Sequence, residues 1–286
     1  MILTATDTLI RYVEIWVPDQ GASRLNRAAC RVVGGPQLAE SERRNCGGAR
    51  SVAAGEGLAG RAWHQKSATI LQEDPSELLD RISLECGASL AAVVAIPIFR
   101  QHEICGVVVL GLGAGFGGAE IWNRDDRDEL AVSVAYYSGL PSFEFITRYT
   151  RFPKGAGIPG QVWESGVPRL LRNVNGSDGF MRSFGNDPAG ISEVIGLPIG
   201  SSHGFADSVL LLLSSQQTPL AGHMELLNDS LSNTDWQKSL TQHVASGQAP
   251  VLCCNSEVSL PHGAEFAVAL PMYRNADPVG TLCFLF

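Results

Sequence analysis

The sequence has few charged residues and no cluster of basic ones. Only 17% of its 286 residues are charged, and the formal net charge is −8 at pH 7. Proteins whose main partner is nucleic acid or an anionic membrane carry basic patches or stripes. We therefore expect neither nucleic acid nor a membrane among the partners of this chain.

Long apolar runs and a secretion signal are also missing. No apolar run approaches the roughly 18 residues that a membrane-spanning helix needs. The first residues, MILTATDTLIRY, show no basic region followed by an apolar one. We expect a cytoplasmic protein, and its seven cysteines, an odd number, are expected to be reduced thiols.

The common catalytic and cofactor motifs do not occur either. The sequence contains no GxxxxGK[ST], no HExxH and no CxxC, so no motif supports a phosphate cradle or a metal site. Cys253 and Cys254 are neighbours, and in a strand they would point to opposite faces, away from a shared metal. The cofactor, if any, is unknown from the sequence.

What the sequence does contain is an internal repeat. With 45% hydrophobic residues the chain can form two to three compact domains. Four segments recur in the same order: YVEIWVPDQ (12–20) as GAEIWNRDD (118–126), GEGLAGRAW (55–63) as GAGIPGQVW (155–163), VAIPIF (94–99) as IGLPIG (195–200), and CGVVVLGL (105–112) as DSVLLLLS (207–214). This pattern predicts two copies of one unit of about 100 residues.

Each copy shows a readable order of elements. Apolar runs at 12–17 and 28–33 predict a β-hairpin, and the glycine motif, a short helix and an irregular helical stretch follow. Runs at 93–99 and 104–112, joined by the polar turn RQHE, predict a closing hairpin. The expected fold class is α+β, an antiparallel sheet with helices packed on its faces.

The glycine motif matches GxGxxG, the pattern of dinucleotide-binding turns. Neither ARSVAA before Gly55 nor RYTRFPK before Gly155 is a buried strand of the length that such a turn requires. A third match, GAGFGG at 113–118, follows an apolar run, but the next residues copy the first hairpin and not a helix. We interpret these glycines as turn residues.

In this order the motifs resemble the GAF domain, a small-molecule-binding and dimerising module of signalling proteins. The stretch DGFMRSFGNDPAGISEVIGLPI (178–199) is similar to the helix, turn and proline-containing strand that wall the pocket of ligand-binding members. The resemblance implies tandem GAF-like (PAS-like or profilin-like) domains at 1–115 and 116–225. The cyclic-nucleotide signature NKxnFx3DE is not evident in either copy.

Residues 226–286 resemble a connector helix followed by a truncated third unit. ASGQAPVLCC (245–254) parallels ESGVPRLLRN (164–173), and VALPMY with VGTLCFLF parallels the closing hairpin. Apolar residues from Met224 to Val244 have roughly helical spacing and predict the connector. A half-unit with unpaired sheet edges is expected to dock on a neighbour, in this chain or in a second subunit.

Two arginines are the main candidates for ligand binding. Arg81 lies 16 positions before Pro97, and Arg182 lies 16 before Pro198. An acid precedes each arginine by four positions, namely Glu77 and Asp178. One interpretation is an exposed helical ion pair. The other is an arginine that turns inward and clamps an anionic group of a ligand.

The remaining candidates are aromatic residues and a thiol. Phe180 falls within the pocket-wall stretch, while Trp63 and Trp163 are either core anchors of a helix or stacking platforms. Cys86 lies 11 positions before Pro97, which resembles the catalytic cysteine of free methionine-(R)-sulfoxide reductase, a GAF enzyme. Gly87 and Val93 replace the acidic residues of that enzyme, and the only conceivable resolving thiol is Cys46.

From these observations we expect a non-enzymatic sensor that binds a small anionic molecule mainly in the second copy. Its macromolecular partner is expected to be a second copy, forming a homodimer, or a signalling protein, because the chain shows no output domain and no long flanking helices. One alternative is an assembly protein whose pockets are vestigial and filled by side chains. The other alternative is a thiol-dependent reductase.

Overall fold

The computed structural model describes residues 8–33, 51–72, 90–174, 182, 190–200, 206–227, 234–274 and 277–286. Strands dominate these ranges, so the α+β expectation holds only loosely. The strands are β1 Ile10–Pro18, β2 Arg24–Val32, β3 Ser51–Ala53, β4 Thr69–Gln72, β5 Ala92–Arg100, β6 Glu103–Leu112, β7 Gly117–Arg124, β8 Leu130–Ser138, β9 Arg151–Phe152, β10 Arg169–Arg172, β11 Ile191–Ile199, β12 Ser208–Ser215, β13 His223–Leu227, β14 Val251–Cys254, β15 Phe266–Arg274 and β16 Asp277–Leu285. The helices are α2 Gly57–Gln65, α4 Pro141–Tyr149, α5 Gly157–Ser165 and α6 Asp235–Gly247.

The strands form three antiparallel sheets, which we call units one, two and three together with their helices. The sheet of unit one has the order β3-β2-β1-β6-β5-β4, and that of unit two runs β10-β11-β12-β7-β8-β9. Read from opposite ends, the two orders correspond strand by strand, as the sequence repeat leads us to expect. Even a β-bulge recurs, between Ile15 and Trp16 in β1 and between Ile121 and Trp122 in β7. The domain boundaries drawn from the sequence stay predictions.

Unit three has four strands in the order β13-β16-β15-β14. β13 pairs with β16 from His223 to Leu227, so the predicted connector helix from Met224 is wrong at its start. The open edge of β16 offers a row of backbone partners to this segment, and that pairing outweighs its helical spacing. The helical part is α6, whose Thr234 and Gln237 form a capping box.

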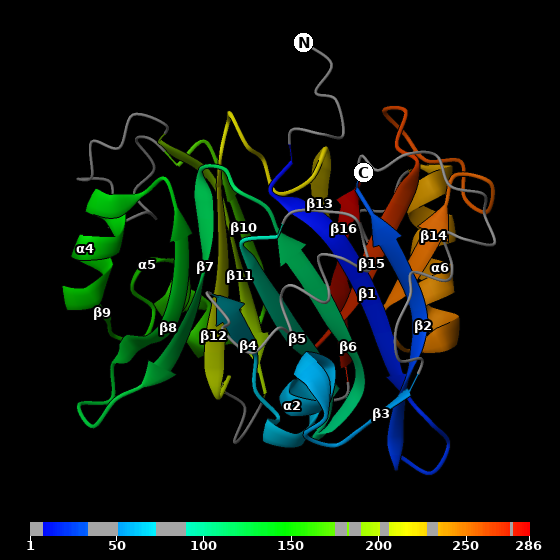
Figure 1. Ribbon diagram of the computed structural model, residues 1–286, viewed down its shortest axis with the longest axis horizontal. Helices are drawn as coiled ribbons and strands as arrows, with labels where there is room; N and C mark the ends of the chain where they lie inside the picture. The colour runs from blue at the N-terminus through cyan, green and yellow to red at the C-terminus, as the bar shows by residue number, and fades with distance from the viewer. Residues whose placement is uncertain are drawn as a thin grey trace.

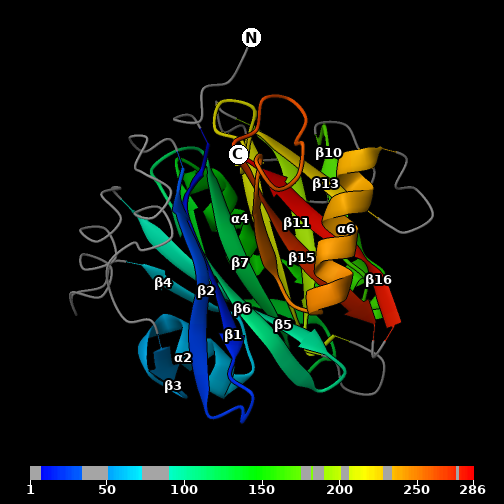
Figure 2. The same cartoon turned by 90° about the vertical axis from the view of Figure 1, so that its right-hand side faces the viewer.

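The three sheets share one apolar core. Strand residues alternate between two faces, and one face of each sheet contributes to a single buried cluster with members such as Ile15, Leu212 and Phe284. The views in Figures 1 and 2 agree that the sheets lie in the middle of the molecule and the helices outside them. Unit three thus docks within this chain on the other two units.

The opposite face of each sheet is covered by that unit's own helices. Three further clusters join α2 to unit one, α4 and α5 to unit two, and α6 to unit three. The helices α2, α5 and α6 end on left-handed residues, Lys66, Gly166 and Gln248, three positions before the next strand begins. Gln248, rather than Gly247, is therefore the counterpart of Gly166. No helix in the described ranges is long and apolar enough to cross a membrane.

The glycine motif is a self-contained turn in both copies. Gly155 and Gly157 have positive φ angles of 76° and 57°, and a Cβ on Gly160 would lie 2.3 Å from the carbonyl oxygen of Pro153. The Gly155 N–H donates to the Gly160 carbonyl at 3.0 Å, and the Ala156 N–H donates to Pro153 at 3.1 Å. Because these donors are already satisfied within the turn, they do not form a pyrophosphate cradle.

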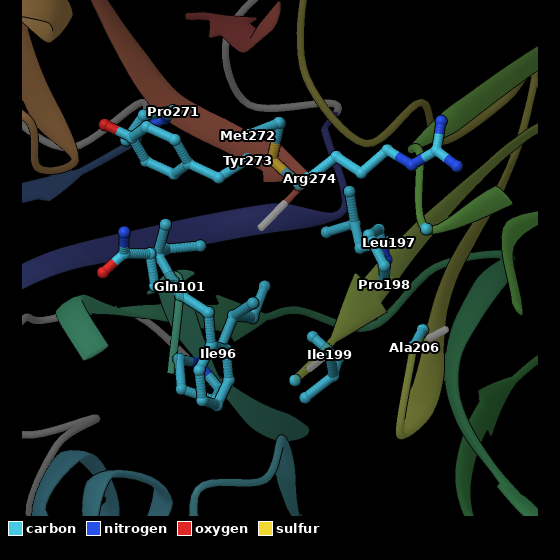
Figure 3. A pocket seen from close by; sticks show the side chains of 15 residues that line it. Ile96, Gln101, Leu197, Pro198, Ile199, Ala206, Pro271, Met272, Tyr273 and Arg274 are labelled. Atoms are coloured by element: carbon cyan, nitrogen blue, oxygen red, sulfur yellow. The ribbon is translucent and has the colours of Figure 1, made fainter. Parts of the chain in front are cut away.

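The proline-containing strands β5, β11 and β15 meet where the three units converge. A cavity of about 30 Å³ lies between them, lined by Pro97, Pro198 and Pro271 among others. Figure 3 shows side chains of all three strands around it, with Ile96, Leu197 and Met272 labelled. A cavity of this size has room for about one or two waters and is too small for a metabolite.

Candidate functional site

A buried glutamate lies at equivalent positions of units one and two. Glu14 in β1 and Glu120 in β7 alternate with core residues, so both side chains lie on the helix-covered face of their sheets. The tryptophan two positions further on donates its indole N–H to the carboxylate, at 2.9 Å from Trp16 and at 2.8 Å from Trp122. A buried carboxylate costs free energy unless such donors satisfy it.

In unit two, three residues besides Trp122 complete the arrangement. The guanidinium of Arg182 is bidentate on Glu120, with Nη1 at 2.6 Å from Oε1 and Nη2 at 2.9 Å from Oε2. The Tyr137 hydroxyl donates to Oε1 at 2.8 Å, and Thr147 accepts from Arg182 Nη1 at 2.8 Å. The carboxylate thus accepts four hydrogen bonds, about the number that its two oxygens can take. We call these five residues the Glu120 cluster.

Aromatic rings surround the guanidinium of this cluster. Its central carbon lies 4.5 Å from the ring centroid of Phe143, 5.1 Å from that of Trp122 and 5.6 Å from that of Phe152. These distances are in the range of cation–π attraction. The side chains of Arg182 and Glu120 are only 2% and 0% exposed. The charge of Arg182 is therefore balanced inside the protein by Glu120 and the rings.

Unit one builds a related cluster from different positions. Glu14 accepts from the Tyr12 hydroxyl at 2.5 Å and from Arg27 Nη1 at 3.0 Å. Tyr12 lies on β1 itself, whereas Tyr137 lies on β8, opposite Gly118 of β7. Gly118 is the counterpart of Tyr12, and a Cβ there would lie 2.4 Å from the carbonyl oxygen of Tyr136. The tyrosine has thus changed strands between the copies while its hydroxyl keeps the same carboxylate partner.

Two titratable groups of these clusters, Tyr137 and Arg27, have pKa values shifted in the direction that their contacts require. Burial and the Glu120 carboxylate raise the pKa of Tyr137, so its hydroxyl stays protonated and donates. Burial opposes the charge of Arg27, but the Glu14 carboxylate outweighs it and the pKa of Arg27 is raised. Neither cluster offers a free base or nucleophile, so each is suited to holding structure rather than to moving protons.

The structure gives different outcomes for the residues predicted from the sequence. Arg182 does turn inward, as the clamp interpretation requires, but the anion that it meets is Glu120. Trp163 is 2% exposed in the core of unit two, as a helix anchor would be, and Trp63 is half-buried against the core of unit one. The other candidates lie outside the described residues: Glu77, Arg81, Cys86, Asp178 and Phe180, together with Cys46.

Sequence reasoning missed both glutamates and Arg27. The signal was the tripeptide EIW, present in both copies at 14–16 and 120–122. Alternation places Glu and Trp on one face of a strand, and an acid two residues from a tryptophan on the buried face needs a donor. Arg27 and Arg182 supply it from different parts of the fold, which a comparison of the two copies alone does not reveal.

Metal and thiol chemistry have little support in the described ranges. They contain no group of three or more His, Cys, Asp or Glu side chains placed to hold a metal. Burial raises the pKa of Cys105 and of Cys253 to about 11 in each case, and raises the pKa of Cys283 as well. A thiol with such a pKa is rarely a thiolate and is a poor nucleophile.

Comparison with known proteins finds likeness at the level of structure. No family model matches the chain, and no curated protein matches it. The GAF domain of A. aeolicus nlh2 in an inactive state is similar at 23% identity and a TM-score of 0.29, over 35% of this chain and 59% of that one. Staphylococcus aureus NreA, mutated in its nitrate-binding site, is similar at 19% identity and a TM-score of 0.29, over 37% of this chain and 79% of that one.

A third solved structure is fRMsr of S. aureus in complex with its substrate. It is similar at 19% identity and a TM-score of 0.26, over 36% of this chain and 56% of that one. The chain therefore spans less than two thirds of the length of the nlh2 and fRMsr structures. The solved structures to which this chain is similar include GAF domains, the family that its sequence motifs resemble.

Proposed function

We propose that this chain is a non-enzymatic regulatory protein of GAF-like units, in which the protein itself fills the family-type site of unit two and which acts by binding another protein. The observation that carries this proposal is the bidentate Arg182–Glu120 pair. A guanidinium suits an anionic ligand because its fork matches a carboxylate. Here a carboxylate of the chain already occupies that position.

The energetics of the pair favour the filled state. A soluble anion that bound Arg182 would displace Glu120 and leave a buried carboxylate without the two hydrogen bonds that Arg182 donates. Removing one partner of a buried ion pair costs about 3–5 kcal/mol, which a weakly bound small anion does not recover. The vestigial-pocket alternative therefore has more support than the anion sensor. An inward-facing Arg182 fits both functions, and its pairing with Glu120 is what favours the vestigial pocket.

Native mass spectrometry of the purified chain separates these two functions. We expect the native mass per chain to equal the denatured mass, because no small anion is held beside Arg182. A reproducible excess mass that disappears on denaturation, and is absent in Arg182→Ala, would overturn the proposal in favour of the sensor. Binding of the same excess mass by Arg182→Ala would place the ligand elsewhere.

The non-enzymatic part of the proposal rests on three of the described thiols, Cys105, Cys253 and Cys283, whose raised pKa values oppose nucleophilic attack. The reductase alternative depends on Cys86 and Cys46, which lie outside the described residues. Assaying reduction of free methionine sulfoxide with the wild-type chain and with Cys86→Ser tests it directly. We expect no activity in either protein, and activity lost only in Cys86→Ser would establish the enzyme instead.

For the partner we propose a second copy of this chain, joined through α4. Phe145 and Tyr149 on this helix are 64% and 75% exposed and contact each other, with ring centroids 5.3 Å apart. Glu144 and Arg148, also four positions apart, form an ion pair at 2.5 Å on the same helix. Two α4 helices packed antiparallel would bury the aromatic residues and place each acid near the other copy's arginine, a self-complementary arrangement.

Light scattering after size exclusion tests this dimer. We expect a mass of twice 30.5 kDa for the wild-type chain and a monomer for the double variant Phe145→Ser, Tyr149→Ser. Val134→Ser is the matched control, because this residue is also an exposed apolar one, at 42%, but lies on β8. A monomeric wild type, or a dimer that survives the double substitution, would contradict the α4 interface.

A further inference from the structure

A second, larger cavity lies where units two and three meet. It measures about 260 Å³ and is lined by the ends of β10, β11 and β12 and by the segment that leads into β13. Pockets for small molecules usually span about 300–1,000 Å³, so this cavity suits a molecule of few heavy atoms. It lies outside the helix-covered face that holds the Glu120 cluster.

Opposite charges lie side by side in its wall. Arg172 of β10 and Glu193 of β11 are cross-strand neighbours, and Arg172 Nε lies 3.4 Å from Glu193 Oε1. A close charged hydrogen bond measures about 2.7–2.9 Å, so this contact is loose. The two side chains are 43% and 24% exposed. Among the described residues Arg172 is the only partner of the Glu193 carboxylate, in contrast to the four donors around Glu120.

The guanidinium of Arg172 is held in place by unit three. Its Nη2 donates to the backbone carbonyl of Met224 in β13, while its Nε is the atom that lies nearest to Glu193. Asn173, with a left-handed φ of 55°, and Gln216 add amide groups to the cavity lining. A fixed cation, a partly paired anion and amides that can donate or accept are therefore available together.

We propose that this cavity binds a small zwitterion, a free α-amino acid, with its carboxylate on Arg172 and its ammonium on Glu193. A simple anion in the same place would face the carboxylate of Glu193, and a simple cation would face Arg172. A molecule that carries a carboxylate and an ammonium group on one carbon satisfies both groups and replaces their loose mutual contact. This inference goes beyond the proposed function, because it adds a ligand site at a junction between units.

Ligand binding in this cavity also affects the contact between units two and three. Arg172 touches the ligand position and the first strand of unit three at once, so a bound carboxylate competes for the same guanidinium as the Met224 carbonyl. A ligand can shift an arrangement only through such a difference in contacts. The amino acid is thus expected to change the melting temperature of the chain as it binds.

Calorimetric titration of the full chain with each of the common free L-amino acids tests the proposal, with acetate and methylammonium as single-charge controls. We expect saturable binding of at least one amino acid and none of either control. Arg172→Gln and Glu193→Gln should each raise its Kd about tenfold or more. Arg169→Gln, on the same strand but exposed and outside the lining, should leave the Kd unchanged.

Three results would overturn the proposal. The first is that no amino acid binds at about 10 mM, a concentration that detects even Kd values in the millimolar range. The second is that acetate binds as well as the amino acid, and the third is that Glu193→Gln leaves the Kd unchanged. Thermal melting of each variant shows whether it is folded. Glu193→Gln keeps the Met224 contact of Arg172, so it tests the ammonium site even if Arg172→Gln does not fold.

Discussion

At the scale of single residues, the same two side-chain types behave differently in two places. Arg182 and Glu120 are buried, bidentate and fully partnered, whereas Arg172 and Glu193 are partly exposed and joined by one long contact. The first pair is structural because water does not compete with it and either partner alone would be costly. The second pair contributes little to stability and is free to bind something else.

Replacing Arg182 by methionine tests the structural role of the first pair. We expect Arg182→Met to lower the free energy of unfolding by about 3–5 kcal/mol, because Glu120 keeps its burial and loses its counter-charge. Arg124→Met, which breaks the exposed pair with Asp128, should cost no more than about 0.5 kcal/mol. Urea unfolding of both variants measures the difference, and equal losses would show that burial of the first pair is unimportant.

His223 lines the cavity between units two and three, and its pKa leads us to expect that stability depends on pH. Burial, the nearby Arg172 cation and His262 lower the pKa of His223 below its usual 6.5, against an opposing effect of Glu225. Above about pH 7.5 the ring is neutral in both folded and unfolded states and has no effect. As the pH falls below that value, the unfolded state takes up the proton first, so the folded state loses stability until its own lower pKa is reached.

We therefore expect His223→Asn to lose less stability than the wild type between about pH 7.5 and about pH 5.5. Burial raises the pKa of Glu193, which works in the opposite direction at lower pH, but this group is present in both proteins. Urea unfolding at a series of pH values gives the comparison. If the free energy of unfolding changes with pH in the same way in both proteins, His223 is not the source of this pH dependence.

At the scale of elements, the glycine turn shows how one local structure serves two units. In each copy the third glycine lies so close to a carbonyl that a Cβ would be 2.3 Å away, from Ala53 at Gly60 and from Pro153 at Gly160. The turn brings the start of α2 or α5 against the sheet. The Gly155 and Ala156 N–H groups donate within the turn itself, so we interpret the motif as a mark of the fold.

Replacing glycine by alanine is expected to have opposite effects on stability at Gly160 and at Gly247. Gly160→Ala should destabilise the chain by about 1–3 kcal/mol, because the backbone must move to admit the methyl group. Gly247→Ala, in the last turn of α6 with no atom within 4 Å of the new Cβ, should stabilise it by about 0.5–1 kcal/mol. Thermal melting of the two variants checks both signs, and a neutral Gly160→Ala would mean that the turn is loosely packed.

The elements also show what could be predicted from the sequence. Hairpins such as the one joining 93–99 to 104–112 are predicted well, because alternation and a polar turn are local signals. β13 was predicted as helix, because its pairing with β16 is a contact between residues more than 50 positions apart. The Glu120 cluster was missed for a related reason, since Glu120 and Arg182 are separated by 62 positions and lie in different kinds of element.

At the scale of the whole molecule, three antiparallel sheets form one body around a shared core. Figure 2 shows α6 on the outside of unit three, away from the sheets of the other units. Within the described residues, the sheet of unit three has no counterpart of β2 and β3, and its apolar face is buried by the neighbouring units. Unit three therefore buries its apolar face against the other two units of the same chain.

This shared core predicts cooperative unfolding. Phe284 of unit three is fully buried in the common cluster, so Phe284→Ala should cost about 3–5 kcal/mol and should lower the midpoint of a single transition seen by all probes. Val134→Ala, 42% exposed on β8, is the control and should change stability little. Two separate transitions, with only one affected by Phe284→Ala, would show that unit three folds independently.

The most direct test of the central claim, that Glu120 takes the place of an anionic ligand, is rescue of a cavity by a small anion. Glu120→Ala removes the carboxylate and leaves Arg182 among its aromatic rings. The account predicts that this variant melts at a lower temperature than the wild type and that added acetate raises its melting temperature in a saturable way, while the wild type does not respond. A wild type stabilised by acetate as strongly as Glu120→Ala would contradict the account, because the position beside Arg182 would then be open to ligands.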